Sequence, residues 1–289
     1  MKTTKIDFMG KRRFALLFSA IVILASLLLL MVRGLNLGID FTGGNLVQVE
    51  FEKDVSVAEV REALSKNNQG NAVIQAYNAK GVIIRIAADK EEDRKVLGET
   101  LKASFPGAKV VRFEKVGPVV GSELRREAVI ALCIALVGIL LYITVRFQFR
   151  FAVVSVLALL HDAIITLGAF SLSGMEVSST FIAAILTIVG YSLNDTIVVL
   201  DRIRENWKNV RSRGILEVLN ESVNETLSRT INTSLTTLLP VFALFFMGGP
   251  VVRPFSFAML VGIVVGTYSS IFIAAALLAE WSIRSPQKV

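Results

Sequence analysis

The sequence predicts a polytopic α-helical membrane protein with six transmembrane helices and one α+β domain inserted after the first helix. Hydrophobic residues make up 53% of the 289 residues, and mean hydropathy is +0.62. This is too apolar for one soluble domain of this length. The excess gathers in runs of eighteen or more apolar residues, long enough to cross a bilayer. Residues 33–127, of ordinary composition, separate the first run from the rest.

The first run, FALLFSAIVILASLLLLMV, covers residues 14–32 and follows a basic Lys-Arg-Arg triplet. A secretory signal peptide is the competing interpretation. However, the run is longer than the apolar region of a signal peptide, and it ends in Val-Arg-Gly-Leu without a small-x-small cleavage site. We therefore expect a transmembrane anchor, preceded by a cytoplasmic tail of residues 1–13.

Residues 128–279 predict a five-helix transmembrane domain. Six spans place both termini on one side of the membrane. Basic residues outside 33–127 gather in the two tails (1–13 and 280–289), in the turn after the second span and in the loop 201–222. The positive-inside rule makes these parts cytoplasmic and residues 33–127 external, so the net charge of +7 indicates topology, not a nucleic-acid partner. The five predicted spans are 128–145, 151–172, 180–200, 230–247 and 255–279.

The external segment predicts a ferredoxin-like fold. Residues 46–52 alternate as a strand does, and Ser56 with Glu59 forms a capping-box pattern at the start of a helix. NAVIQAY and GVIIRIA predict a hairpin, 89–105 a second helix, and AKVVRFEKV a fourth strand. This β-α-β-β-α-β order predicts a four-stranded antiparallel sheet with both helices on one face. Its balanced charge favours a binding or lever-like module.

Catalytic and metal-binding motifs are missing from the sequence. It has no metal-ligand spacing, Walker loop or nucleophile elbow, so we expect no enzyme activity, cofactor or metal site. Cys133 is the only cysteine, which excludes an intramolecular disulfide. Its place in the second span predicts a buried apolar filler.

The stretch GIDFTGGN, residues 38–45, joins the first span to the first strand. One interpretation is a simple glycine turn before a strand. The other is a fixed joint that couples the external domain to the membrane. The joint would consist of Asp40, Phe41, Thr42, Gly43 and Gly44.

Asp195 is an acidic residue inside the fourth span, in VGYSLNDTIVVLDRIREN. It precedes the charged edge at Asp201 by six residues, which is about 9 Å along a helix. An ionised carboxylate at span centre costs about 2.5–3.5 kcal/mol. Tyr191 and Thr187 precede it at helical spacing, with Asn194 beside it, so a polar stripe should face other helices or water. Asp195 is thus either a proton or ion carrier or a neutral, hydrogen-bonded packing group.

Arg229 directly precedes the fifth predicted span and is followed at helical spacing by Thr233. If the helix already begins near Val223, Arg229 is also about 9 Å deep. It is either a partner for Asp195 or an arginine that extends to the membrane surface. His161 and Asp162 lie in the middle of the third span. Adjacent helical residues point about 100° apart. We therefore expect only one of this pair to line a pathway and the other to be structural.

Three motifs together resemble the SecF subunits of bacterial Sec preprotein translocases: GIDFTGG, VGYSLNDTIVVLDRIREN and LSRTINTSLTTLLP. The resemblance covers essentially the whole chain. It implies one half of an RND-type transporter in the bacterial inner membrane, paired with a SecD-like subunit and associated with the Sec channel complex. The pair would use the proton-motive force at a late stage of preprotein translocation.

The resemblance also implies residue roles. The family's membrane aspartate falls on Asp195 and its arginine on Arg229, and a further essential aspartate belongs to SecD. Two alternatives to this function stay open. An RND-like exporter of a small lipophilic substrate would need a wide apolar cleft in the external domain. A passive translocase scaffold would not need a titrating Asp195.

Overall fold

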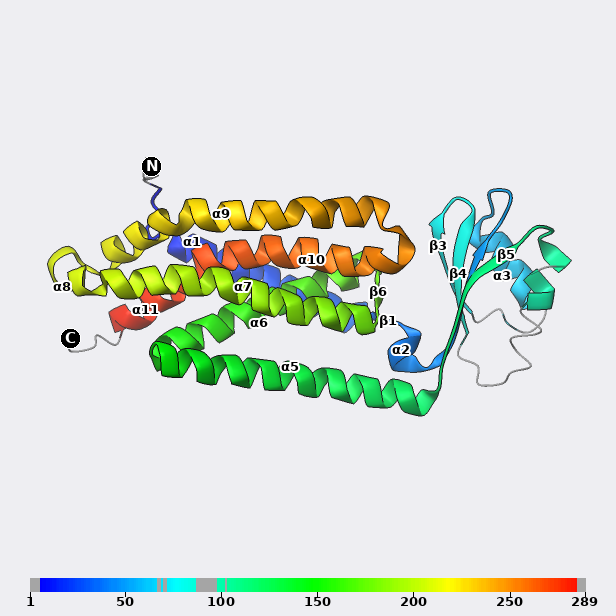
Figure 1. Cartoon of the computed structure of the whole chain (residues 1–289), viewed down its shortest axis with the longest axis horizontal. Helices are drawn as coiled ribbons and strands as arrows, with labels where there is room; N and C mark the ends of the chain where they lie inside the picture. Colours follow the sequence, from blue (N-terminus) through cyan, green and yellow to red (C-terminus); the bar gives the residue numbers. More distant parts are fainter. Residues whose placement is uncertain (1–5, 67–68, 70–71, 87–97, 102, 285–289) are drawn as a thin grey trace. The chain divides into compact units, whose positions relative to one another are not determined.

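The computed structural model describes residues 6–66, 69, 72–86, 98–101 and 103–284 (Figure 1). The chain divides into two compact units. The membrane unit consists of Met1–Asn36 and Ile130–Val289, and the α+β unit of Leu37–Val129.

Six helical segments of the described chain are long and apolar enough to cross a membrane, which confirms the predicted polytopic fold. The fifth begins fifteen residues before its predicted span, because the polar stretch after Gly214 is also helical and buries Val218, Leu219 and Val223. The spans are α1 (Arg12–Val32), α5 (Pro118–Arg146), α6 (Phe149–Ser173), α7 (Ser179–Asn206), α9 (Ile215–Met247), and α10 (Gly249–Ser269), which continues through a π-helical turn (Ser270–Ala274) into α11 (Ala275–Arg284).

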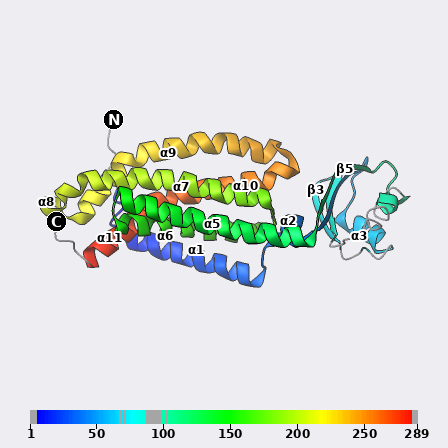
Figure 2. The same ribbon diagram turned by 60° about the horizontal axis from the view of Figure 1, so that its bottom comes forward.

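Short elements connect the membrane helices. A 3-10 turn (Trp207–Asn209) and α8 (Val210–Arg213) link α7 to α9, and these two long helices run side by side in opposite directions (Figures 1 and 2). Two-residue strands β1 (Asn36–Leu37) and β6 (Glu176–Val177) form a small sheet.

Glycines on α10 allow it to lie directly against α7. A Cβ added at Gly262 would lie 2.4 Å from Cδ1 of Ile188, and one at Gly266 would lie 2.9 Å from Cβ of Ser192. Small residues at helix interfaces let backbones approach in this way. The approach brings Ser192 of α7 and Ser269 of α10 to the same carboxyl oxygen of Asp162 on α6.

The predicted burial of Cys133 is wrong, since the thiol is exposed. It lies on α5, whose span is hardly buried within the chain. Exposed neighbours such as Ile134, Val137 and Leu141 show the reason. Hydropathy identified α5 as a membrane helix, but it does not tell a side chain that faces protein from one that faces lipid.

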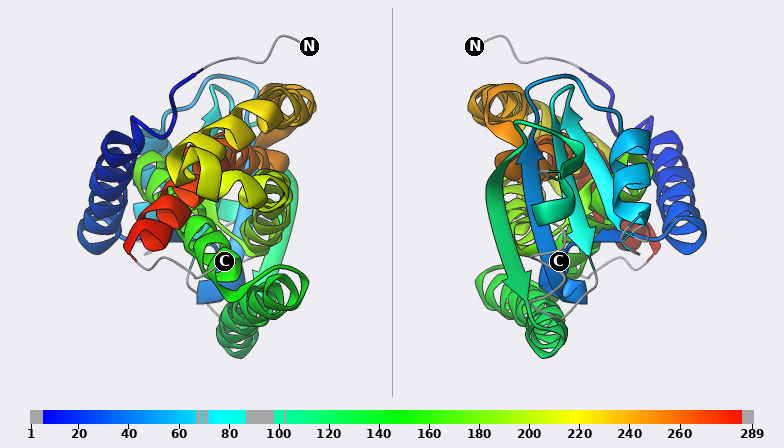
Figure 3. Two further views of the ribbon diagram at one scale, coloured as in Figure 1. Left: turned by 90° about the vertical axis from the view of Figure 1, so that its left-hand side faces the viewer. Right: turned by 90° about the vertical axis from the view of Figure 1, so that its right-hand side faces the viewer.

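The α+β unit confirms the predicted ferredoxin-like fold. Its sheet has the order β3-β4-β2-β5, with every neighbouring pair antiparallel, and α3 lies against one face (Figure 3). Most of the predicted second helix lies outside the described residues, but residues 98–101 are helical. The elements are β2 (Gly44–Glu50), α3 (Val57–Ser65), β3 (Val73–Asn78), β4 (Gly81–Ile86) and β5 (Lys109–Val116).

The core of this unit forms on one face of the sheet. Val47, Val49 and Phe51 alternate along the chain and are buried beneath Val60 and Leu64 of α3. Each fully buried aliphatic side chain contributes about 1.5–3 kcal/mol, so this alternation fixes which face of β2 packs inward.

The GIDFTGGN stretch folds as α2 (Ile39–Thr42) followed by two glycines with positive φ, +71° at Gly43 and +124° at Gly44. A Cβ at Gly43 would lie 2.8 Å from Cα of Pro118, and one at Gly121 would lie 2.9 Å from N of Gly43. The backbone of this stretch therefore touches the first turn of α5. Glycine is required at residue 43 both by its dihedral angle and by this contact.

Gly43→Ala is expected to destabilise the junction of β2 with the start of α5. A side chain in this backbone region costs about 1–3 kcal/mol, and the facing atom is backbone that cannot rotate away. Amide hydrogen exchange of the full chain in nanodiscs should become faster in β2 and β5. Gly117→Ala is the matched control, because a Cβ there meets nothing within 4 Å. Equal protection in both variants would contradict a structural requirement for glycine at residue 43.

The capping box predicted for α3 is present. Ser56 Oγ accepts the Glu59 amide at 3.2 Å, and Glu59 Oε2 accepts the Ser56 amide at 2.7 Å. The Ser56 amide, and then the Ser56 hydroxyl at 2.9 Å, donate to Glu59 Oε2 and hold the pKa of this carboxyl group below its ordinary value of 4.5.

The pKa of Glu59 predicts an acid-sensitive helix start. Because the folded-state pKa is depressed, the capping contribution is complete above the ordinary pKa and is lost as the pH falls through the folded-state value. Amide exchange in the first turn of α3 should accelerate on acidification relative to its last turn. Glu59→Gln retains a hydrogen-bond acceptor but cannot titrate. In this variant, amide exchange in the first turn of α3 should lack the pH dependence.

Candidate intramembrane polar site

Asp195 lies where three membrane helices meet. Its side chain on α7 is 3% exposed, and its Oδ2 accepts a hydrogen bond from Ser234 Oγ of α9 at 3.2 Å. Ser234 Oγ is also 2.6 Å from Thr267 Oγ1 of α10. One long hydroxyl bond compensates an ionised carboxylate poorly, whereas it suffices for a neutral carboxyl group. The site can therefore hold a proton at low cost.

Arg229 does not form an ion pair with Asp195 in the described part of the chain. Its side chain is exposed on α9, although its charge acts electrostatically on the Asp195 carboxyl group. Asp195 instead contacts Ser234, five residues after Arg229 on α9, and Arg229 points outward.

Tyr191 and Thr233 mark the contact between α7 and α9. The Tyr191 hydroxyl donates to the Thr233 carbonyl at 2.8 Å and to Thr237 Oγ1 at 3.1 Å. Thr233 Oγ1 donates to the Arg229 carbonyl at 2.8 Å, so this residue contributes its carbonyl to the contact. Asn194 is exposed.

The residues of the predicted polar stripe differ in burial: Thr187 is exposed, Tyr191 is half-buried and Asp195 is buried. The buried face of α7 instead runs through Ile188, Ser192, Asp195 and Val199, at a spacing of four, three and four. Thr187 lies one residue before Ile188 and so about 100° away around the helix.

Six residues of α7 and α9 form an exposed polar face. Tyr191 of α7 and Thr233 of α9 are the residues at which the two helices touch. On α7 the exposed residues lie four residues before, one residue before and three residues after Tyr191, and on α9 they have the same offsets from Thr233. These offsets place them on one side of each helix. Because α7 and α9 are antiparallel (Figure 1), the two rows lie on the same side of the contact. The polar face consists of Thr187, Gly190, Asn194, Arg229, Asn232 and Thr236, which are all exposed.

The neighbouring exposed row of α9 is apolar. It contains Ile231, Leu235, Leu239, Phe242 and Phe246, which suit contact with lipid. The contrast between these two rows distinguishes the polar face from an ordinary membrane-facing surface.

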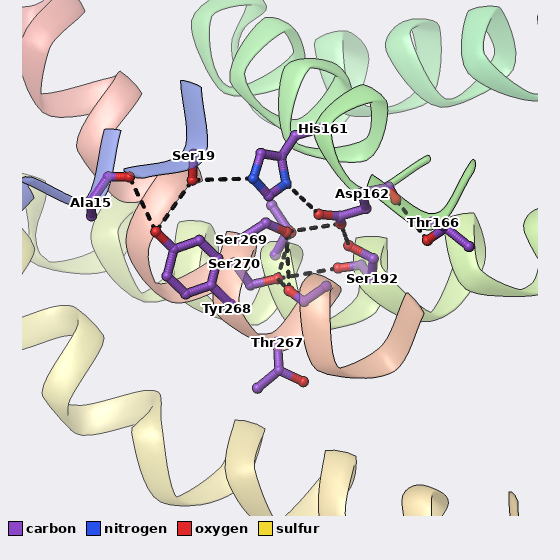
Figure 4. Close-up of polar contacts among 12 residues, drawn as sticks. Ala15, Ser19, His161, Asp162, Thr166, Ser192, Thr267, Tyr268, Ser269 and Ser270 are labelled. Atoms are coloured by element: carbon purple, nitrogen blue, oxygen red, sulfur yellow. Dashed lines mark hydrogen bonds and ion pairs between the residues drawn. The ribbon is translucent and has the colours of Figure 1, made fainter. Parts of the chain in front are cut away.

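His161 and Asp162 form a second polar cluster on α6 (Figure 4). They are in contact with each other although adjacent helical residues point about 100° apart. His161 Nδ1 lies 2.8 Å from Asp162 Oδ1, and both side chains are buried. Their Cα–Cβ directions diverge, but the length of the imidazole lets Nδ1 reach the adjacent carboxyl group.

Several hydroxyl residues of this cluster were not predicted. Ser192 and Ser269 donate to Asp162 Oδ2 at 2.6 and 2.8 Å, and Ser19 Oγ lies 3.2 Å from His161 Nε2. Ser270 Oγ is 2.8 Å from Thr196 Oγ1 at the adjoining π-helical turn. Serine within an apolar span is the only sequence signal, and it also fits ordinary bonding to the preceding turn.

Comparison with known proteins places the chain among protein export components. A family model described as "Protein export membrane protein SecD/SecF, C-terminal" matches residues 96–284, and "SecD/SecF GG Motif" matches residues 28–55. The chain is 44% identical to protein translocase subunit SecF of Magnetococcus marinus, over 100% of this chain and 96% of that protein. It is 46% identical to the subunit SecF of Desulfurispirillum indicum, over 96% and 92%.

A solved structure shares the architecture. The crystal structure of SecDF, a translocon-associated membrane protein from Thermus thermophilus, matches with a TM-score of 0.92 at 42% identity. The match covers 97% of this chain and 39% of that chain, so the present chain spans well under half of the solved protein. The family models, the full-length relatives and this structure agree: the chain belongs to the SecD/SecF family of protein export membrane proteins.

Proposed function

We propose that this chain is the SecF subunit of a bacterial Sec translocase and works with a SecD subunit. The pair uses the proton-motive force to assist a late stage of preprotein translocation. The observation that carries the proton role is Asp195, a carboxyl group buried at a three-helix junction, one residue after Asn194 of the polar face. The naming of the relatives as translocase subunits supports the protein-export role.

The polar face supports a SecD partner. A charged group such as Arg229 costs about 2.5–3.5 kcal/mol at the centre of a lipid-facing helix, and Asn194 and Asn232 would leave amides without partners there. A second subunit that covers this face removes these costs. The solved SecDF chain is more than twice as long as this chain, which leaves room for such a half.

Proton transfer at Asp195 follows from general electrostatics. An apolar bundle favours a neutral carboxyl group, whereas an approaching cation favours the anion. Movement of α9 relative to α7 changes how strongly Arg229 acts on Asp195, so helix movement and proton release are linked. Each proton that crosses 100 mV supplies about 2.3 kcal/mol for that movement. The GIDFTGGN joint transmits the movement to the external unit.

Neither of the two alternative functions, an exporter of small lipophilic molecules or a passive scaffold, is favoured. An exporter of small lipophilic molecules disagrees with the names of full-length relatives at 44% and 46% identity. A passive scaffold accounts for the family but gives no reason for a titratable carboxyl group buried among the membrane helices.

The orientation in the bacterial inner membrane is part of the proposal. Single cysteines at Lys80 and Arg211, introduced with Cys133→Ser, should label from opposite sides of sealed cells. Position 80 should react with an impermeant maleimide added outside, and position 211 only after permeabilisation, because cationic loops stay cytoplasmic. Labelling of both positions from outside would contradict the topology.

Export in living cells tests the proposed function. Cells depleted of their own SecF should regain normal secretion of a reporter preprotein when this chain and its SecD partner are expressed together. The chain without SecD, at the same membrane level, should restore little. Full restoration of export by a chain that lacks the polar face, with Leu at Asn194, Arg229 and Asn232, would contradict the SecD requirement.

A further inference from the structure

A second buried network surrounds His161 and Asp162, and the proton role of Asp195 does not use it (Figure 4). His161 is 4% exposed and Asp162 1% exposed. The network joins four helices, because its members come from α1, α6, α7 and α10. His161 is also the only histidine of the chain.

The hydrogen-bond partners of Asp162 are donors. Its Oδ2 accepts from Ser192 Oγ at 2.6 Å and from Ser269 Oγ at 2.8 Å, while Oδ1 faces His161 Nδ1 at 2.8 Å. An ionised carboxylate accepts three bonds without conflict, whereas a neutral one must donate through one oxygen. A neutral carboxyl group would have to donate through Oδ1 to a bare His161 Nδ1; the two hydroxyl donors at Oδ2 and the greater basicity of imidazole favour the carboxylate, with Nδ1 as the donor.

The other ring nitrogen faces a chain of hydroxyl groups. Tyr268 OH donates to the carbonyl of Ala15 at 3.1 Å, and Ser19 Oγ donates to Tyr268 OH at 3.2 Å. Each hydroxyl has one hydrogen, so Ser19 has none left for His161 Nε2, which lies 3.2 Å away. Nε2 must then donate to Ser19.

We infer that His161 carries protons on both ring nitrogens and forms a buried imidazolium–carboxylate pair with Asp162, a proton-binding site separate from Asp195. The pair is neutral overall and fully hydrogen-bonded, the condition under which buried charges are tolerated. The inference does not rest on the proposed export function.

Charged and titratable neighbours are few on the described helices packed around the pair. Tyr268 of α10 stacks on the imidazole with ring centroids 6.2 Å apart. On α7, Asp195 lies three residues after Ser192, and Tyr191, directly before it, bonds to α9 through its hydroxyl. From α1 and α11, Arg12 and Glu280 pair with each other at 2.9 Å. None of these supplies a second counter-ion in direct contact with His161.

This proton also determines how α1 is held. An imidazole with a bare Nε2 would need Ser19 to donate to it, so Tyr268 would keep only one of its two bonds to α1, either with Ser19 or with the Ala15 carbonyl. The two arrangements differ by one proton and by one link between α10 and α1. Occupancy of the site therefore affects the attachment of a helix that is otherwise largely exposed.

Nitrogen-15 labelling of histidine gives a direct test because the chain has one histidine. Solid-state NMR of the full chain in liposomes at pH 7.5 reports whether each ring nitrogen carries a proton. At this pH an imidazole in water is about nine-tenths neutral, so a protonated ring would differ clearly from a free one. We expect both nitrogens of His161 to be protonated. A neutral ring with one bare nitrogen would overturn the inference.

Variants distinguish a buried ion pair from a histidine that is buried without a charge. Asp162→Asn removes the counter-ion and should convert His161 to a neutral ring. Ser19→Ala removes the acceptor at Nε2 and should increase the neutral fraction. Ser26→Ala is the matched control, since Ser26 is also buried on α1, against Gly168 of α6, and should leave the signal unchanged. An unchanged imidazolium signal in both Asp162→Asn and Ser19→Ala would also contradict the inference.

Discussion

Asp195→Asn is expected to abolish the potential-dependent part of preprotein export while the protein folds, inserts and assembles normally. The amide is nearly isosteric and keeps an oxygen to accept the bond from Ser234 Oγ, now 3.2 Å from Asp195 Oδ2. It cannot release a proton. One proton crossing 100 mV supplies about 2.3 kcal/mol, a factor of about 50 in an equilibrium, so the loss should exceed roughly tenfold. Preprotein release from vesicles with and without a membrane potential measures it.

Two further variants control this experiment. Asp195→Glu keeps a titratable group displaced by one methylene and should retain part of the potential-dependent release. Ser234→Ala removes the hydroxyl partner but leaves the carboxyl group, so it should be milder than Asp195→Asn. If Asp195 were only a packing group, the order would reverse, because Glu would overpack a tight site and Asn would fit.

Replacing the polar face by leucine is expected to separate the chain from SecD. The variant with Leu at Asn194, Arg229 and Asn232 should insert at least as well as the wild type, because leucine suits lipid. Interhelical polar contacts contribute about 0.6 kcal/mol each and about 1.7 at most, so three lost contacts amount to roughly 2–5 kcal/mol. Recovery of SecD in a pull-down from mild detergent should fall by more than about tenfold.

The neighbouring apolar row provides the control for this variant. Alanine at Leu235, Leu239 and Phe242 changes as many exposed residues of the same bundle but leaves the polar face intact. SecD recovery should stay near the wild-type level. Equal losses in both triple variants would show that general helix packing, not the polar face, holds the partner.

The architecture could be predicted from the sequence because length, hydropathy and alternation determine it. Eighteen or more apolar residues identify each span, and the pattern of Val47, Val49 and Phe51 identifies the buried face of β2. Helix starts were less accurate. The start of α9 was missed because its first three turns are polar on one face and carry Glu217 and Glu221.

The polar site was only partly predictable. The depth of Asp195 follows from counting residues along a helix, and its burial followed from the cost of exposing a carboxyl group to lipid. Pairing with Arg229 did not follow, because residue counts give depth but not the rotation of α9 about its axis. The Asp162 cluster depends on Gly262 and Gly266, which let α10 approach α7, and this is a tertiary effect that serine residues in separate spans do not reveal.

Proton flux is the most direct test of the central proposal. Vesicles that contain this chain with its SecD partner, loaded with a pH-sensitive dye, should acidify when an inward-directed potential is applied. The account predicts that Asp195→Asn lowers this flux to the level of empty vesicles, at matched protein content and with SecD still bound. Wild-type flux in the Asp195→Asn complex would contradict a proton role for this residue.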